Sequence, residues 1–123
     1  MHETTMKMID TVIRVLTERD SFWEDHGKGW NFSLSMDNSN PDWPSKKWFL
    51  IGRENHGTGK GSLALHGDFG DSGPGDGYTM SVYLLMDMTR GEIITRINKP
   101  DFREELYREL EDLEQRIRKH DSY

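Results

Sequence analysis

Glycine and polar residues suited to ligand binding gather in residues 52–77, which hold nine of the twelve glycines of the chain. The first part, Gly52 to Ser62, superficially resembles a phosphate-binding loop. In that motif a fixed spacing joins two glycines to a lysine, and a helix begins directly afterwards, so that its N–H groups face the phosphate. Here Glu54 occupies the position of the first glycine, and no helical pattern follows Lys60. The stretch therefore predicts a mobile hairpin loop in which glycine supplies positive φ angles.

Three aspartates, Asp68, Asp71 and Asp76, stand in the second part of the same stretch. Carboxylate oxygens on a flexible loop are the ligands that calcium binds. The stretch lacks the alternating acidic positions and the distal glutamate of a calcium-binding loop. We expect the three aspartates to be solvated turn residues that a partner can reach, and we predict no metal site.

Glu54 and His56 lie two positions apart, so on a strand they would share one face. With His66 on a neighbouring strand, they would form a pair able to move protons. No serine or threonine nucleophile motif accompanies them, so they are interpreted as polar residues at a strand end and no catalytic residue is assigned. The chain contains no cysteine, which excludes disulfides, thiol nucleophiles and cysteine-bound metal centres. We expect no cofactor.

Trp43 lies between Pro41 and Pro44 in an otherwise polar loop. Tryptophan is enriched among the residues that contribute most to binding at protein interfaces. The side chain either closes the end of the core or stands out as an anchor for a partner, and the sequence leaves both interpretations open.

Hydrophobic periodicity predicts the elements that position these residues. Ile9, Val12, Ile13 and Leu16 have the spacing of one helical face, which predicts a helix over residues 5–19. Alternation of apolar and polar residues predicts strands. Five strands are expected, at residues 30–36, 47–51, 62–66, 78–87 and 92–97. Residues 88–91 are typical of a hairpin connection between the last two strands, and short links favour an antiparallel meander.

Within the strand expected at residues 78–87, alternation assigns one set of side chains to the core: Tyr78, Met80, Val82, Leu84 and Met86. The last element shows a different period, typical of an amphipathic helix. Its apolar stripe consists of Phe102, Leu106, Leu110, Leu113 and Ile117. Asn98 is expected to cap this helix, and Glu114 is expected to form an i,i+4 ion pair with Arg118.

Together these elements predict one α+β domain over residues 1–123. An N-terminal helix, an antiparallel meander sheet of about five strands and a C-terminal amphipathic helix would pack in two layers. No apolar run approaches the length of a membrane span. The first eight residues lack the basic and apolar regions of a secretory signal. We therefore expect a cytoplasmic protein that does not contact membranes.

The charge balance indicates the class of partner. The chain has a net charge of −6, which argues against direct binding to nucleic acid. Acidic residues cluster at 24–25, 37–42, 68–76 and in the first half of the last helix, and charge complementarity guides docking onto a basic surface. We expect a non-catalytic acidic binding protein, an inhibitor of a basic protein partner of the immunity or anti-defence type. The expected binding residues are Trp43, Glu54, His56, Asp68, Asp71 and Asp76.

Two alternatives remain open at this level. The first is a small enzyme, or a metal- or ligand-binding protein, that uses residues 52–77. The second is an interaction domain that dimerises through a helix or a sheet edge. The sequence leaves the oligomeric state open between a monomer and a homodimer.

Overall fold

The computed structural model describes residues 2–19, 23, 29–37, 47–69 and 78–121. In this part of the chain the elements follow in the order α1, β1, β2, β3, β4, α2, α3. The helices are α1 (Glu3–Glu18), α2 (Arg90–Ile97) and α3 (Pro100–Asp121). The strands are β1 (Asn31–Asp37), β2 (Lys47–Glu54), β3 (Lys60–Phe69) and β4 (Tyr78–Thr89). The predicted α+β architecture is confirmed. The chain begins with a helix, continues through an antiparallel sheet and ends in helices.

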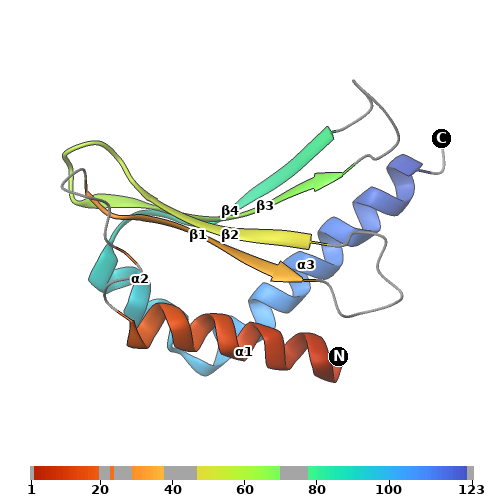
Figure 1. Ribbon diagram of the computed structural model, residues 1–123, viewed down its shortest axis with the longest axis horizontal. Helices are drawn as coiled ribbons and strands as arrows, with labels where there is room; N and C mark the ends of the chain where they lie inside the picture. Colours follow the sequence, from red (N-terminus) through yellow and green to blue (C-terminus); the bar gives the residue numbers. More distant parts are fainter. Residues whose placement is uncertain (1, 20–22, 24–28, 38–46, 70–77, 122–123) are drawn as a thin grey trace.

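The described strands form one antiparallel sheet in the order β1-β2-β3-β4, so each strand pairs with its neighbour in sequence. The sheet is strongly curved, and the helices pack against the same face of it (Figure 1). Alternate strand residues face the helices and are buried, among them Leu50, Leu63 and Leu65. The intervening residues face away from the helix layer.

The fifth strand predicted at residues 92–97 is wrong, because this segment forms α2. Ile93 and Ile97 are one helical turn apart and both are buried, which is helical and not alternating spacing. Thr89 caps the helix: its hydroxyl accepts the N–H of Glu92, and the Glu92 carboxylate accepts the N–H of Thr89. Hydrogen bonding of this carboxylate to Thr89, first to its backbone N–H and then to its side chain, holds the pKa of Glu92 below its ordinary value. Residues 88–91 therefore end β4 and begin a helix instead of forming a hairpin.

The apolar stripe predicted for the last helix is confirmed for the described side chains of α3. Phe102, Leu106, Leu110 and Leu113 are all buried. The prediction that Asn98 caps α3 is wrong. Asn98 ends α2, where its N–H donates to the carbonyl of Ile94, and α3 begins two residues later. The short link between the helices thus turns the chain directly from α2 into α3.

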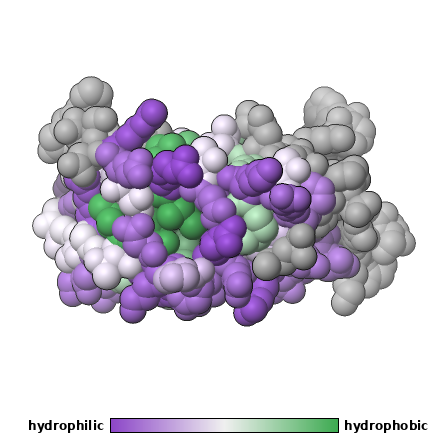
Figure 2. All heavy atoms as spheres, turned by 90° about the horizontal axis from the view of Figure 1, so that it is seen from below, coloured by the Kyte–Doolittle hydropathy of each residue, from purple (hydrophilic) through white to green (hydrophobic). Residues whose placement is uncertain are grey.

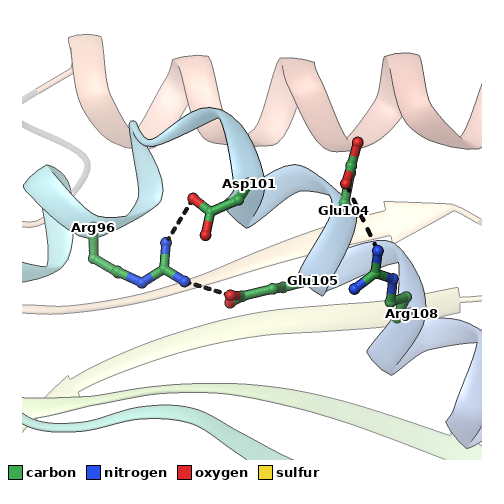
Figure 3. Close-up of polar contacts among 5 residues, drawn as sticks. All are labelled: Arg96, Asp101, Glu104, Glu105 and Arg108. Atoms are coloured by element: carbon green, nitrogen blue, oxygen red, sulfur yellow. Dashed lines mark hydrogen bonds and ion pairs between the residues drawn. The ribbon is translucent and has the colours of Figure 1, made fainter.

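Ion pairs join the helices to each other on their solvent side. Arg96 of α2 donates to Asp101 and Glu105 of α3, as Figure 3 shows. Arg103 of α3 makes two hydrogen bonds to the carboxylate of Asp10 in α1, at 2.7 and 2.6 Å. The bonded carboxylate raises the pKa of Arg103 above its ordinary value. Such paired, planar contacts fix the angle between helices because both donors must align with both oxygens.

The predicted pair between Glu104 and Arg108 of α3 is also present (Figure 3). Glu114 of the same helix lies in the core. Its side chain is 0% exposed and accepts a 2.7 Å hydrogen bond from the indole N–H of Trp48 in β2. The Arg118 side chain lies outside the described part of the structure, so the pair of Glu114 with Arg118 stays a prediction. Seen from the side on which α1 lies, the surface of the described residues is mostly hydrophilic, with apolar side chains showing between the polar ones (Figure 2).

The hairpin loop expected within residues 52–62 is present but shorter than predicted, because β2 extends to Glu54 and β3 begins at Lys60. Gly52 lies in β2, where an added Cβ would stand 2.2 Å from the ring of Phe32 in β1. Gly61 lies in β3, where a Cβ would stand 2.0 Å from the carbonyl oxygen of Arg53. Only residues 55–59 form a turn in the described part of the stretch, with Gly57 and Gly59 at positive φ. Close packing thus requires glycine at positions 52 and 61.

The pairing of β3 with β4 is irregular in two places, between Gly61 and Leu63 and between Leu63 and Ala64. Each irregularity adds residues to β4 relative to β3, which is the pattern of a β-bulge. The bulges change which side chains face the helices: Leu85 stands opposite buried Leu63, whereas Met86 is 65% exposed. The predicted core position of Met86 is therefore wrong.

Candidate functional site

The sheet face opposite the helices is open within the described part of the molecule. Strand pairing places its residues in rows that cross the sheet. One row consists of Ser33, Ile51, Ala64 and Tyr83. The next row towards the β2–β3 turn contains Asn31, Arg53 and Ser62. Neither row contains an acidic residue, which is notable in a chain with 22 aspartates and glutamates.

A polar hollow of about 460 Å³ lies at the β2–β3 end of this face. Its lining residues are Trp30, Asn31, Arg53, Glu54, Asn55, His56, Ser62 and Tyr83. Small Ser62 and Ala64 of β3 separate Arg53 of β2 from Tyr83 of β4. Two strand spacings span about 10 Å. Because the side chains of β3 are small here, space remains between the side chains of Arg53 and Tyr83. We call this feature the turn-end hollow.

Glu54 and His56 both line the turn-end hollow, so the structure brings these two predicted residues together. Glu54 is half-buried, and its carboxylate accepts hydrogen bonds from the N–H groups of Trp30 and Gly59, both at 3.4 Å. This carboxylate thus connects the start of β1 to the β2–β3 turn. His56 is exposed in that turn. His66 pairs with Phe49, five residues further along β3 than the Glu54 partner Gly61, so it does not join them.

The other end of the sheet is where β1 and β3 end and where β2 and β4 begin. Asp37 pairs there with Lys47, and Phe69 pairs there with Tyr78. The β1–β2 connection and the β3–β4 connection therefore both leave the sheet at this end. We call it the acidic end, because the two connections and the strand ends that flank them include Asp37, Asp42, Asp68, Asp71 and Asp76.

The remaining predicted residues belong to this second end by their place in the chain. Asp68 lies in β3 opposite Thr79. Trp43, Asp71 and Asp76 lie outside the described residues, within the two connections that leave the acidic end. Asp68 is seven residues along β3 from Gly61, at most about 23 Å away along the strand. Of the predicted binding residues that the structure describes, Glu54 and His56 thus lie at one end of the sheet and Asp68 lies at the other.

Three residues of the open face were not singled out from the sequence: Arg53, Tyr83 and Met86. Tyr83 is 64% exposed, and with Met86 it forms the pair of large exposed apolar side chains among the described residues. The alternation in β4 signals that Tyr83 faces away from the core. No sequence signal marks the bulge that exposes Met86.

Within residues that the structure describes, no group of three or more histidine, aspartate or glutamate side chains is placed to hold a metal ion. Among the same residues, no helix combines the length and apolar character needed to cross a membrane. Comparison of the chain with protein-family models, curated proteins and solved structures finds no significant match.

Proposed function

We propose that this protein is a non-catalytic binding protein that docks the acidic end of its sheet onto a basic surface of a protein partner. The observation that carries the proposal is the shared exit of the β1–β2 and β3–β4 connections, defined by the pairs Asp37–Lys47 and Phe69–Tyr78. Two acidic segments that are far apart in sequence thereby start from neighbouring strand ends. Inhibition of a basic partner, of the immunity or anti-defence type, is the form of this function that we favour.

Charge supports this surface over the opposite end of the sheet. The two connections and the strand ends beside them contain five aspartates against two lysines, Lys46 and Lys47. At the turn end the described charged groups include Arg53 and Lys60 beside Glu54. Complementary charge raises the rate of encounter and sets orientation, so a basic partner would approach the acidic end first. Trp43 in the β1–β2 connection adds an aromatic anchor of the kind that dominates interface energies.

The glycine-rich stretch supports the enzyme alternative less than its composition suggests. Gly52 and Gly61 are accounted for by packing against Phe32 and the Arg53 carbonyl. Glu54 is accounted for by its hydrogen bonds to Trp30 and Gly59. These residues therefore have structural tasks that need no substrate.

The test begins with affinity capture of partners from the source cells, followed by binding kinetics with the captured protein. Asp68, Asp71 and Asp76 are changed together to lysine. The matched control changes Glu3, Glu18 and Glu111, which are exposed on α1 and on the second half of α3, to lysine. We expect association to slow at least tenfold for the first triple variant, to change little for the control, and to slow with added salt in the unmodified protein, because salt screens charges over about 8–10 Å.

Trp43→Ala separates the anchor from the charges. As an anchor Trp43 would mainly slow dissociation, so its removal should raise the dissociation rate with little effect on association. Binding that is unaffected by salt and equally affected by the two triple variants would contradict docking through the acidic end. Recovery of a metal or small molecule with the protein, and of no macromolecule, would contradict the proposed class.

A further inference from the structure

We propose that the turn-end hollow is a second binding site, which takes a small ligand that has an oxyanion group attached to a flat apolar ring. This site is separate from the acidic end and does not depend on the protein partner. The proposal rests on the composition of the hollow, on the availability of its cation and on the spacing of its walls.

The cation is Arg53. Its side chain is exposed on β2, and within the described residues its guanidinium has no ion-pair partner. By contrast, Arg96, Arg103 and Arg108 of the helices are engaged by carboxylates. Arginine presents a planar fork of donors that matches the oxygens of a carboxylate or phosphate. Arg53 is therefore a free oxyanion receptor in the wall of a hollow.

Neutral donors surround this cation. Ser62 of β3 is the register partner of Arg53, and Asn55 and His56 close the hollow at the turn. Amide and hydroxyl groups can donate further hydrogen bonds to an oxyanion. The one carboxylate in the lining, Glu54, already accepts two backbone N–H groups. The lining thus offers several donors to one negative group.

The ring preference comes from Tyr83. Its side chain is 64% exposed on β4, across the small residues Ser62 and Ala64 from Arg53. The separation of about 10 Å between β2 and β4 accommodates a flat ring beside the Tyr83 ring while the oxyanion reaches Arg53. Offset stacking of rings adds to the energy of burial.

Three probes test the site by nuclear magnetic resonance titration of the full chain: inorganic phosphate, phenyl phosphate and benzoate. We expect at least one ring-bearing probe to shift the backbone amide signals of Arg53, Ser62 and Tyr83 in a saturable way, and to bind more tightly than inorganic phosphate. Tighter binding of phenyl phosphate identifies a phosphate ligand, and tighter binding of benzoate identifies a carboxylate. No saturable shift with any probe up to about 20 mM, where ligands of millimolar affinity saturate, would overturn the proposal.

Variants locate the binding. Arg53→Gln should weaken the ring-bearing probe at least tenfold and Arg53→Lys should weaken it less, since lysine keeps the charge but loses the planar fork. Arg14→Gln, at an exposed arginine of α1, is the matched control and should leave affinity within twofold. Tyr83→Ala should weaken the ring-bearing probe and leave inorganic phosphate unchanged. Equal losses from Arg53→Gln and Arg14→Gln, or full binding of the ring-bearing probe by Tyr83→Ala, would overturn the site as drawn.

Discussion

The buried hydrogen bond between Trp48 and Glu114 offers the sharpest test of the packing between sheet and helix. The two side chains are 1% and 0% exposed, and the indole nitrogen lies 2.7 Å from a carboxylate oxygen. Replacing Glu114 by leucine keeps a similar volume but removes the acceptor of the indole N–H. A buried donor left without an acceptor costs about 1–3 kcal/mol, so we expect Glu114→Leu to lower the free energy of unfolding by this amount.

Three further variants show whether the loss comes from this contact. Glu114→Gln keeps an oxygen acceptor for the indole and should cost less than Glu114→Leu. Trp48→Phe removes the donor and also opens space in the core, so it should destabilise on both grounds. In the double variant Trp48→Phe/Glu114→Leu both polar groups are absent. Its loss should be smaller than the sum of the single losses by about 1–3 kcal/mol, which is the coupling energy of residues in direct contact.

Equilibrium unfolding in urea at neutral pH measures all four variants against the unmodified protein. The slope of the free energy with denaturant must stay constant for the comparison to hold. Losses that add to within about 0.5 kcal/mol, the range found for independent sites, would refute the contact between Trp48 and Glu114. A Glu114→Leu variant as stable as Glu114→Gln would refute the role of the carboxylate as a necessary acceptor.

Three other predictions follow from the packing of the described residues. Leu110→Ala should destabilise by about 2–5 kcal/mol, whereas Glu111→Ala on the exposed side should stay within about 0.5 kcal/mol in the same urea assay; equal small losses would contradict the buried face of α3. Gly52→Ala should destabilise the fold by about 1–3 kcal/mol through overpacking. Gly91→Ala, whose added Cβ meets no neighbour within 4 Å, should stabilise α2 by about 0.5–1 kcal/mol. Thermal unfolding measures both variants, and stability changes of the same sign would contradict this prediction. Folding holds the pKa of Glu92 below its ordinary 4.5, so its ionised form stabilises the fold above that pH and this contribution is lost as the pH falls through the lower, folded-state pKa. Glu92→Ala should therefore destabilise at neutral pH, and its difference from the unmodified protein should shrink in acid; a difference that is constant from pH 7 to pH 3 would contradict the cap.

Strong periodicity made α1, α3 and the strands predictable from the sequence. The stripe of Phe102, Leu106, Leu110 and Leu113 has one geometric solution, because only a helix places residues three and four apart on one line. Short polar links between alternating segments likewise leave an antiparallel meander as the simplest pairing. Local spacing therefore determined these elements without knowledge of their neighbours.

The segment at residues 92–97 shows where local propensity misleads. Its isoleucines favour a strand, since branched side chains suit a pleated surface. The sequence also contains the helix signal that prevails: Thr89 followed three residues later by Glu92 is a capping box. The glycine at position 91 made the same residues resemble a turn. Burial of Ile93 and Ile97, one helical turn apart, stabilises the helical conformation where α2 packs against the sheet.

Glu114 and Met86 could not be placed from periodicity. Glu114 adjoins the apolar stripe of α3, and its burial depends on the indole N–H that Trp48 brings from β2. Met86 follows the alternation of β4 until the bulges shift it outward. Both outcomes depend on contacts between segments, which the spacing of residues within one segment does not encode.

The two candidate surfaces also differ in how far the sequence alone predicts them. Grouping of the acidic connections at one end of the sheet follows from the meander topology alone, so it was within reach of the sequence. The turn-end hollow depends on register, because Arg53 and Tyr83 flank Ser62 and Ala64 only when β2, β3 and β4 pair as observed. A shift of one residue in either pairing would turn one of these side chains to the other face.

The bulges in β4 have a consequence for how the protein behaves at high concentration. β4 is an outer strand of the sheet, and an outer strand with a straight row of free N–H and C=O groups can recruit a strand from another molecule and so begin aggregation. Near its end this strand contains both irregularities and Asp87, which has a φ angle of 56°. A foreign strand could align with the regular part that begins at Tyr78, but not with the full length of β4. The distortion that exposes Met86 thus also limits edge-to-edge growth of the sheet.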